Sequence, residues 1–241
     1  MRIIDLLFST QILRKRIVNR AQKYHLSNTL AKLQSKGISP QVVFDIGART
    51  GEWSKDLKKV LKHSEFFLFE ATESCRQQLS NSGFKFFITV LSDSQKEVDF
   101  YENGTTGDSY YKEHTAFYKN VRPVKKQTTD LDCLVAAEGV PAADLIKLDT
   151  QGSELDILDG AQRTLKNTSL IYIECPIIEY NLGAPRLTDY LQYMRELGYL
   201  PFEICEQHFG DDILLQVDIM FIKKSVYEKY YPKSRRTFYG F

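Results

Sequence analysis

Five expected β-strands in this chain end in polar residues that could bind a small polar ligand. In chain order, these strand ends are Asp45-Ile46-Gly47, Glu70-Ala71, Ser92-Asp93, Asp149-Thr150-Gln151-Gly152 and Glu174-Cys175. In an open α/β sheet, a ligand binds beyond the carboxyl ends of the strands, where the amides of the first turn are free. Buried acids are costly unless they are paired or hydrogen-bonded, so a ring of them favours a polar, cationic ligand. The alternative is that each acid only caps the helix that follows it.

The turn after the first expected strand distinguishes between nucleotide cofactors. A dinucleotide site has the pattern G-x-G-x-x-G, whose glycines let a pyrophosphate approach the helix. Here Asp45 precedes Gly47, Ala48 and Gly51, and Arg49 occupies the place of the middle glycine. A carboxylate before the turn would repel a pyrophosphate but could hold an aminocarboxypropyl group through its ammonium. The turn therefore points away from NAD and towards S-adenosylmethionine.

The next two strand ends complete the expected cofactor site. Glu70 lies nineteen positions after Gly51, which matches the offset of about 20 residues for an acid that binds ribose hydroxyls. Ala71 follows it at the same strand end. Ser92 and Asp93 would lie near the adenine, where the carboxylate could accept from the exocyclic amine.

Several segments in order resemble the FkbM family of S-adenosylmethionine-dependent methyltransferases. They are DIGARTG, FLFEA, SDS, TTDLD, LIKLDTQGSELDILDGA and LIYIEC, and the resemblance covers roughly residues 42–223. It implies a class I Rossmann-like methyltransferase fold and O-methylation, often of a sugar or polyketide hydroxyl. The expected acceptor is therefore a carbohydrate or another hydroxyl-bearing small molecule, and Asp149 is expected beside both the cofactor and the reacting atoms.

One departure from the family pattern concerns the general base. The family's usual turn has Glu where this chain has Gln151, and Gln keeps the hydrogen bonding but loses the charge. An alcohol acceptor must lose its proton during transfer, so a base nearby would help. We expect that base among His208, Glu174 and Asp149, with His114 as a weaker candidate.

The loop 105–115 and the segment 179–186 are expected to flank the acceptor. The polar stretch 104–126 is longer than most connections in a compact domain, and such loops are usually functional or disordered. We predict that Tyr110, His114, Gln151 and Glu179 bind substrate, and the alternative is a surface loop with packed tyrosines. Asp149, Glu174 and Asp218 could converge on a metal ion, but no tight acidic cluster in the sequence demands one, so none is predicted.

The elements that must position these residues alternate between strands and helices. Strand-like runs at 42–47, 66–71, 84–92, 144–149, 170–175, 199–205 and 217–224 are separated by helical patterns. This order predicts an α/β fold with a mostly parallel seven-stranded sheet and helices on both faces. Residues 97–103 alternate like a half-exposed strand and should form a hairpin with the run 84–92.

The chain ends are expected to flank this domain. We predict a helical extension at 1–38, the Rossmann-like domain at 39–226 and a basic, aromatic tail at 227–241. The basic run 14–20 could touch a membrane surface, but packing on the domain is preferred because charge runs are usually solvated faces. For the tail, docking or a homodimer contact is preferred over nucleic-acid binding.

Composition excludes several classes of partner. The 241 residues are 43% hydrophobic, and 32 basic against 31 acidic residues leave a net charge of +1, so no global field favours nucleic acid. No segment has the roughly 20 apolar residues that a transmembrane helix needs. The four cysteines lack metal-ligand spacing, and we expect a cytoplasmic protein. An NAD(P)-dependent oxidoreductase and a non-catalytic cofactor-binding module remain as alternatives, the second because of Gln151.

Overall fold

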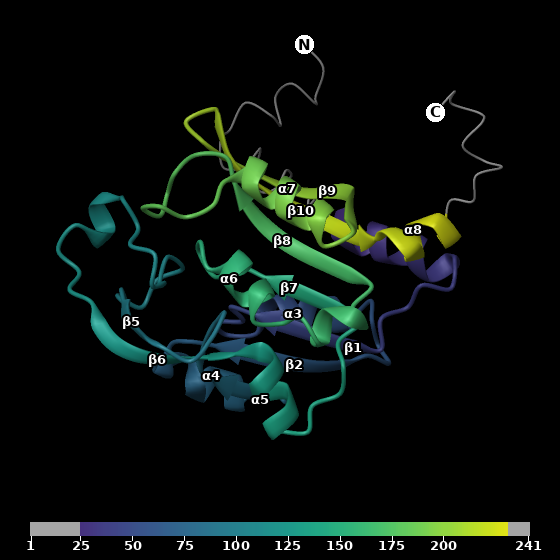
Figure 1. Ribbon diagram of the computed structural model, residues 1–241, viewed down its shortest axis with the longest axis horizontal. Coiled ribbons are helices and arrows are strands. Elements are labelled where there is room, and N and C mark those ends of the chain that lie inside the picture. The colour runs from purple at the N-terminus through teal and green to yellow at the C-terminus, as the bar shows by residue number, and fades with distance from the viewer. Residues whose placement is uncertain (1–24, 231–241) are drawn as a thin grey trace, which may run out of the picture.

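The alternating runs build a seven-stranded sheet at the centre of the molecule (Figure 1). The computed structural model describes residues 25–230. In sheet order, the strands are β3 (Lys85–Ile88), β2 (Glu65–Glu70), β1 (Val42–Ile46), β7 (Leu145–Leu148), β8 (Leu170–Pro176), β10 (Ile213–Lys223) and β9 (Tyr199–Gly210).

Five strands of this sheet are parallel and bring their carboxyl ends to one edge. β3, β2, β1, β7 and β8 pair in parallel, whereas β10 is antiparallel to both β8 and β9. The prediction of an α/β fold with a mostly parallel seven-stranded sheet is confirmed. Because β1 and β7 are neighbours, the strand ends at Ile46 and Leu148 lie side by side.

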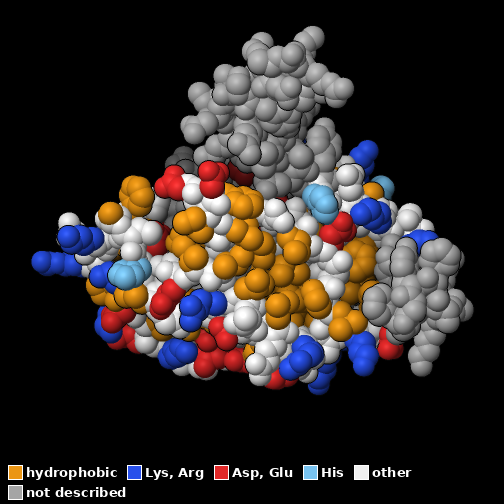
Figure 2. All heavy atoms as spheres, turned by 90° about the horizontal axis from the view of Figure 1, so that it is seen from above, with side chains coloured by type: hydrophobic (Ala, Val, Ile, Leu, Met, Phe, Trp, Pro, Cys, Tyr) orange, Lys and Arg blue, Asp and Glu red, His pale blue; other side chains and the backbone are white. Residues whose placement is uncertain are grey.

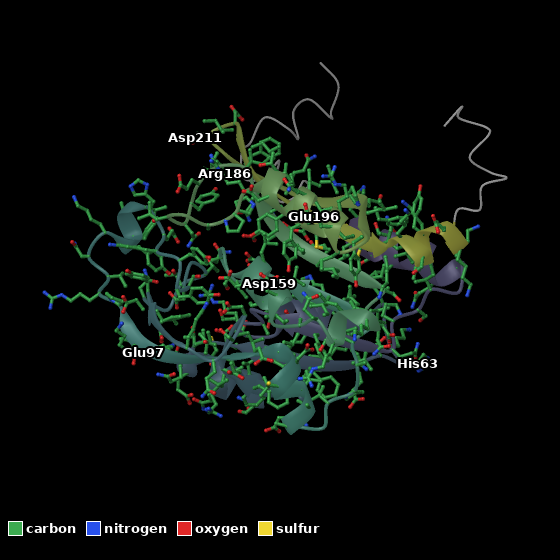
Figure 3. All side chains as sticks on the ribbon, viewed as in Figure 1. His63, Glu97, Asp159, Arg186, Glu196 and Asp211 are labelled. Carbon is green, nitrogen blue, oxygen red and sulfur yellow. The ribbon has the colours of Figure 1, made fainter. Side chains whose placement is uncertain are left out.

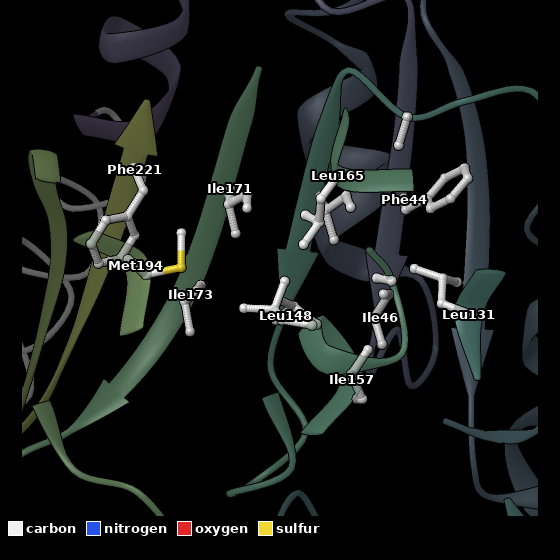
Figure 4. Close-up of a cluster of buried hydrophobic side chains, with 14 of the residues drawn as sticks. Phe44, Ile46, Leu131, Leu148, Ile157, Leu165, Ile171, Ile173, Met194 and Phe221 are labelled. Carbon is white, nitrogen blue, oxygen red and sulfur yellow. The ribbon is translucent and has the colours of Figure 1, made fainter. Parts of the chain in front are cut away.

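Each face of the sheet is covered by helices because successive side chains of a strand point to opposite faces. On one face, Phe44 and Ile171 pack with residues of α5 (Leu131–Ala137), α6 (Glu154–Asp159) and α7 (Leu187–Glu196), as Figure 4 shows for Leu131, Ile157 and Met194. On the other face lie a helix at 25–35, α3 (Glu52–Lys58), α4 (Arg76–Ser80) and α8 (Lys224–Tyr230). Between residues 25 and 230, the chain also forms three short 3-10 helices: η1 (Glu73–Cys75), η2 (Ala116–Tyr118) and η3 (Thr164–Lys166).

The helix at 25–35 is part of the core. Its Leu30 and Leu33 are fully buried against the sheet, and it ends just before Gly37, which has a φ of 83°. The expected N-terminal helix is thus present over these residues. The rest of that extension, with the basic run 14–20, and the tail beyond residue 230 lie outside the described residues. α8 continues across the expected boundary between residues 226 and 227.

A second, three-stranded sheet differs from the sequence prediction. It consists of β4 (Val90–Ser92), β6 (Val124–Asp130) and β5 (Glu97–Phe100), with β6 in the middle. Residues 97–103 were expected to pair with the run 84–92, but β5 pairs with β6 instead. The sequence does not predict β6 because this strand lacks alternating apolar side chains. Its side chains form ion pairs instead, and the Lys125 Nζ lies 2.9 Å from the Asp99 carboxylate on β5. The run 84–92 is also divided at Thr89, whose N–H donates to the Glu70 carbonyl.

Apolar side chains also reach the surface. Figure 2 shows hydrophobic side chains gathered over the middle of the face that looks up in Figure 1, with charged side chains around the edge. Within residues 25–230, no helix is both long and apolar enough to cross a membrane.

Candidate active site

A large cavity at the carboxyl edge of the sheet is formed by the ends of β1, β2, β4 and β7 and by the loop at 104–110. It contains about 820 Å³ of empty space and opens to solvent. Of the residues predicted to bind the cofactor, it is lined by Gly47, Glu70, Ala71 and Asp149. Apolar walls come from Leu91, Phe100 and Ile157. The mixture of polar and apolar groups in its lining suits a nucleoside, which has a polar sugar and a flat apolar base.

Glu70, at the end of β2, is held in one orientation by backbone donors. Its Oε2 accepts from the Arg49 N–H at 2.7 Å, and its Oε1 accepts from the Thr72 N–H at 2.8 Å. The residue is 8% exposed and lines the cavity. Each carboxylate oxygen has a second lone pair, so the group can still accept from two neighbouring hydroxyls.

Gly47 lets the ends of β1 and β7 approach each other. It has a φ of 76°, and a Cβ at this position would lie 1.9 Å from the Asp149 carbonyl oxygen. Only glycine fits such a position without moving the backbone. Gly51 and Ala48 do not line the cavity and instead shape the turn. Gly51 is the N-cap of α3 and has a φ of 76°, and the Ala48 N–H donates to the Phe69 carbonyl.

The structure does not bring Asp45 to the cavity, although its carboxylate was expected to hold the cofactor ammonium. The residue is fully buried. Its Oδ1 lies 3.1 Å from the Lys147 Nζ, and its Oδ2 accepts from the Ser54 hydroxyl at 2.6 Å. Burial alone would lower the pKa of Lys147, but Asp45 and Asp149 raise it above its ordinary value. The Asp45 carboxylate is therefore paired with Lys147 inside the protein.

Lys147 connects this buried pair to the cavity wall. Its Nζ donates to the Gly47 carbonyl at 3.1 Å and lies 3.3 Å from the Asp149 carboxylate. Asp149 has 36% of its side chain exposed, so it is the partly accessible carboxylate of the group. The sequence interpretation missed Lys147, although a lysine inside the buried run DLIKLD requires an acidic partner.

Gln151 lies between two cavities at the carboxyl edge of the sheet. It lines the large cavity and also a smaller hollow of about 310 Å³, which includes Glu174, Glu179, Tyr180 and Asn181. Its Nε2 donates to Asp149 at 3.1 Å and to Glu174 at 2.9 Å. The amide thus bridges two carboxylates, which a glutamate at this position could not do while ionised.

The turn that carries Gln151 is fixed by Glu154. This buried carboxylate accepts from the N–H groups of Thr150 at 2.7 Å and Gly152 at 3.0 Å, and from the Tyr190 hydroxyl at 2.6 Å. Burial raises the pKa of Glu154 above its ordinary value. Glu154 therefore holds the turn through its backbone N–H groups and packs against α7 through Tyr190.

The smaller hollow contains two of the predicted acceptor residues, Gln151 and Glu179. It also contains Glu174, a predicted base. Burial and the nearby carboxylates of Asp149 and Asp218 raise the pKa of Glu174 well above its ordinary value. A carboxyl group that holds its proton more tightly is a better proton acceptor when ionised.

Four further predicted site residues do not lie where they were expected. Tyr110 lines the large cavity rather than the hollow, and its hydroxyl donates to Asp156 at 2.9 Å. Ser92 is buried behind it, 3.1 Å from the same hydroxyl. Asp93 is at the surface in an ion pair with Lys96, and the exposed His114 lines neither cavity. Asp93 departs from the expectation because β4 turns away into the second sheet.

His208 belongs to a separate group on the antiparallel strands. Its Nε2 lies 3.3 Å from Asp218 and 3.9 Å from Glu206, and it lines neither of the two cavities. Asp218 was considered as a possible metal ligand together with Asp149 and Glu174, although no metal was predicted. It lies directly opposite Glu174 on β8 and directly opposite Glu206 on β9.

Comparisons with known proteins agree with this geometry. A family model described as the methyltransferase FkbM domain matches residues 45–201. The 2-O-methyltransferase NoeI of Sinorhizobium fredii (strain NBRC 101917 / NGR234) is 28% identical over 151 residues, which are 55% of this chain and 62% of that protein. The match thus spans less than two thirds of the relative's length.

Two solved structures are more distantly similar. The precorrin-6y C5,15-methyltransferase of Geobacter metallireducens has 14% identity and a TM-score of 0.46, covering 90% of each chain. Human N-acetylserotonin methyltransferase in complex with SAM has 10% identity and a TM-score of 0.42, covering 92% of this chain and 59% of the other. The match of the family domain to residues 45–201, which include both cavities' strand ends and the Gln151 turn, shows that this chain belongs to the FkbM family of methyltransferases.

Proposed function

We propose that this methyltransferase uses S-adenosylmethionine and methylates a hydroxyl group of a sugar. The observation that carries the proposal is the position of Gln151, whose amide contacts Asp149 at the wall of the large cavity and Glu174 in the smaller hollow. A methyl donor in the first space and a hydroxyl in the second would meet beside this side chain.

The large cavity supports the cofactor half of the proposal. The Glu70 carboxylate, held by two backbone N–H groups, is suited to the two hydroxyls of a ribose. Leu91, Phe100 and Ile157 supply apolar walls for a base. Asp149 would hold the ammonium of the amino acid part, a role that the sequence interpretation gave to Asp45.

The chemistry divides between the cofactor and the protein. When bound, the cofactor supplies an activated methyl group with its own leaving group, so the protein mainly aligns donor and acceptor. The acceptor hydroxyl must lose its proton as the new bond forms. Glu174 lines the hollow and is the carboxylate that Gln151 positions, so we assign it as the general base.

A sugar acceptor is favoured by the polar lining of the hollow. Glu179, Tyr180 and Asn181 surround it, and they offer carboxylate, hydroxyl and amide groups that can bind several hydroxyls at once. The named relative is a 2-O-methyltransferase, which supports transfer to oxygen.

Calorimetric titration with S-adenosylhomocysteine tests the cofactor. Glu70→Ala should weaken binding at least about tenfold, because two hydroxyl hydrogen bonds to a charged group are lost. Glu65→Ala, at the exposed start of the same strand, is the matched control and should bind normally. Binding of NAD(P) without binding of S-adenosylhomocysteine would overturn the proposal in favour of an oxidoreductase.

Methyl transfer from labelled cofactor to a panel of glycans and nucleotide sugars tests the acceptor. Glu174→Gln should keep cofactor affinity while lowering kcat about 100-fold or more, as expected when a general base is removed. Cofactor binding without transfer to any hydroxyl on the panel would favour the non-catalytic module instead.

A further inference from the structure

We propose that Glu206, His208 and Asp218 form a binding site for a divalent transition-metal ion on the paired strands β9 and β10. One nitrogen and two carboxylate oxygens of these residues lie within 4.8 Å of one another. Spacing of this order lets three ligand atoms close on one ion with small side-chain movements, since metal–ligand distances are about 2.0–2.2 Å.

Strand geometry brings the three side chains to one face. Glu206 and His208 are two positions apart on β9, so they share a face. Asp218 on β10 lies directly across from Glu206 in the antiparallel pairing. Opposite residues in such a pair have Cβ atoms about 4.5–5.5 Å apart, which is close enough for their carboxylates to share a ligand.

Two buried atoms in this group are without hydrogen-bond partners. The His208 Nε2 and the Asp218 Oδ1 are both shielded from solvent, and neither makes a hydrogen bond. They lie 3.3 Å apart, which is ion-pair distance for a protonated His208 but does not meet hydrogen-bond geometry, and Asp218 is 8% exposed. Leaving such atoms unsatisfied costs free energy. An ion between them would satisfy both.

The charges along the sheet point to a cation as well. Glu174 on β8, Asp218 on β10 and Glu206 on β9 occupy directly opposite positions on three neighbouring strands. Like charges at opposite positions destabilise a sheet. A divalent ion bound by two of these carboxylates would offset the repulsion among the three negative charges.

A further side chain already orients one of the ligands. The Tyr172 hydroxyl, which is buried, donates to Asp218 Oδ2 at 2.8 Å. This bond turns the other oxygen, Oδ1, towards His208. Metal-binding carboxylates are typically held by such outer hydrogen bonds, and losing one lowers metal affinity about 10–100-fold.

The ligand set selects the type of ion. An imidazole nitrogen favours Mn²⁺, Fe²⁺, Co²⁺ or Zn²⁺ over Mg²⁺ and Ca²⁺, which prefer oxygen ligands. Three protein ligands leave further positions for water or a substrate oxygen. Because Asp218 is the neighbour of Glu174, an ion here would lie on the acceptor side of the site proposed above. Binding of the ion itself does not depend on that proposed function.

Titration of tag-free, chelator-treated protein with CoCl₂ tests the site. Co²⁺ reports nitrogen and oxygen ligands through its visible absorption bands, and calorimetry gives its Kd without any cofactor or acceptor. His208→Gln and Asp218→Asn should each weaken binding at least about tenfold, and Tyr172→Phe should weaken it by a similar factor. MgCl₂ at equal concentration should not compete.

Two variants serve as matched controls. Asp211→Asn changes an acid at the tip of the β9–β10 hairpin, away from the cluster, and His63→Gln changes a histidine at the far side of the molecule (Figure 3). Both should bind Co²⁺ normally. Circular dichroism identifies any variant that fails to fold, and Glu206→Gln is the substitute if Asp218→Asn does so.

Two results would overturn the metal site. One is the absence of Co²⁺, Zn²⁺ and Mn²⁺ binding up to millimolar concentration, which would leave a proton on His208 as the compensating charge. The other is equal binding by the wild type and by His208→Gln and Asp218→Asn. Either result would leave the proposed methyl transfer untouched, because cofactor binding is measured separately.

Discussion

The Nζ of Lys147 lies 3.1 Å from the Oδ1 of Asp45, and both side chains are almost completely buried. This ion pair lies directly beneath the turn at Gly47. A change in this pair should therefore alter both the stability of the domain and the shape of the large cavity.

Removing one partner of this pair should be costly. Lys147→Met leaves the Asp45 charge buried without its partner, so the free energy of unfolding should fall by about 3–5 kcal/mol. Urea unfolding measures the change. Lys55→Met breaks the exposed pair with Glu52 and should cost at most about 1 kcal/mol. Equal stability of the two variants would show that the buried pair does not stabilise the fold.

Gly47→Ala should disrupt the meeting point of β1 and β7. The new Cβ would overlap the Asp149 carbonyl, so we expect a loss of more than about 3 kcal/mol and of S-adenosylhomocysteine binding. Gly83→Ala is the control, because Gly83 has a similar φ of 79° but open space around it. It should cost only about 1–2 kcal/mol. Similar losses in both variants would mean that backbone angle, and not close approach, explains Gly47.

Gln151→Glu tests the assignment of the base. It would place a third carboxylate between Asp149 and Glu174 and remove both amide donors, so stability should fall by about 1–3 kcal/mol and kcat should fall as well. Gln151→Met, which removes the donors without adding charge, should lose less stability. A variant Gln151→Glu with a higher kcat than the wild type would move the base from Glu174 to position 151.

Asp132 should contribute a measurable dependence of stability on acid pH. Burial alone would raise the pKa of Asp132, but hydrogen bonds from Thr164 and from the Arg163 N–H lower it below its ordinary value of 3.8. A lowered pKa gives stability that is fully present above pH 3.8 and is lost as the pH falls through the folded-state pKa.

The test compares urea midpoints from pH 7 to pH 2. Asp132→Asn should be about 1–3 kcal/mol less stable than the wild type at pH 7, and the difference should shrink towards pH 2. Asp99→Asn, in the exposed pair with Lys125, should change stability little across the range. A constant difference at all pH values would show that the charge of Asp132 does not matter.

Hydrophobic periodicity was enough to predict the main sheet from the sequence. Buried strands such as β1, β7 and β8 are continuous apolar runs, and their carboxyl ends lie at one edge in any parallel arrangement. The positions of Glu70 and Gly47 at this edge were predicted for the same reason. β6 was missed because its side chains are held by ion pairs at the surface, a pattern that has no apolar signal.

Contacts that depend on register could not be predicted. The opposition of Glu206 and Asp218 follows from how β9 and β10 pair, including irregular steps in that pairing. Asp149 lies at the cavity and Asp45 does not, because Lys147 on β7 pairs with Asp45 inside the protein. That contact depends on the register between β1 and β7. These facts belong to the tertiary structure, although the buried lysine itself was a visible clue.

Arg49 and Gln151 both line the large cavity with left-handed backbones, at φ values of 48° and 58°. Such conformations cost a non-glycine residue about 1–3 kcal/mol, and glycine would relieve that strain. A screen that rewards only heat resistance should therefore enrich Arg49→Gly and Gln151→Gly among its first variants. The same variants would lose two side chains that line the proposed cofactor cavity. Selection for stability and selection for activity would therefore favour different residues at these two turns.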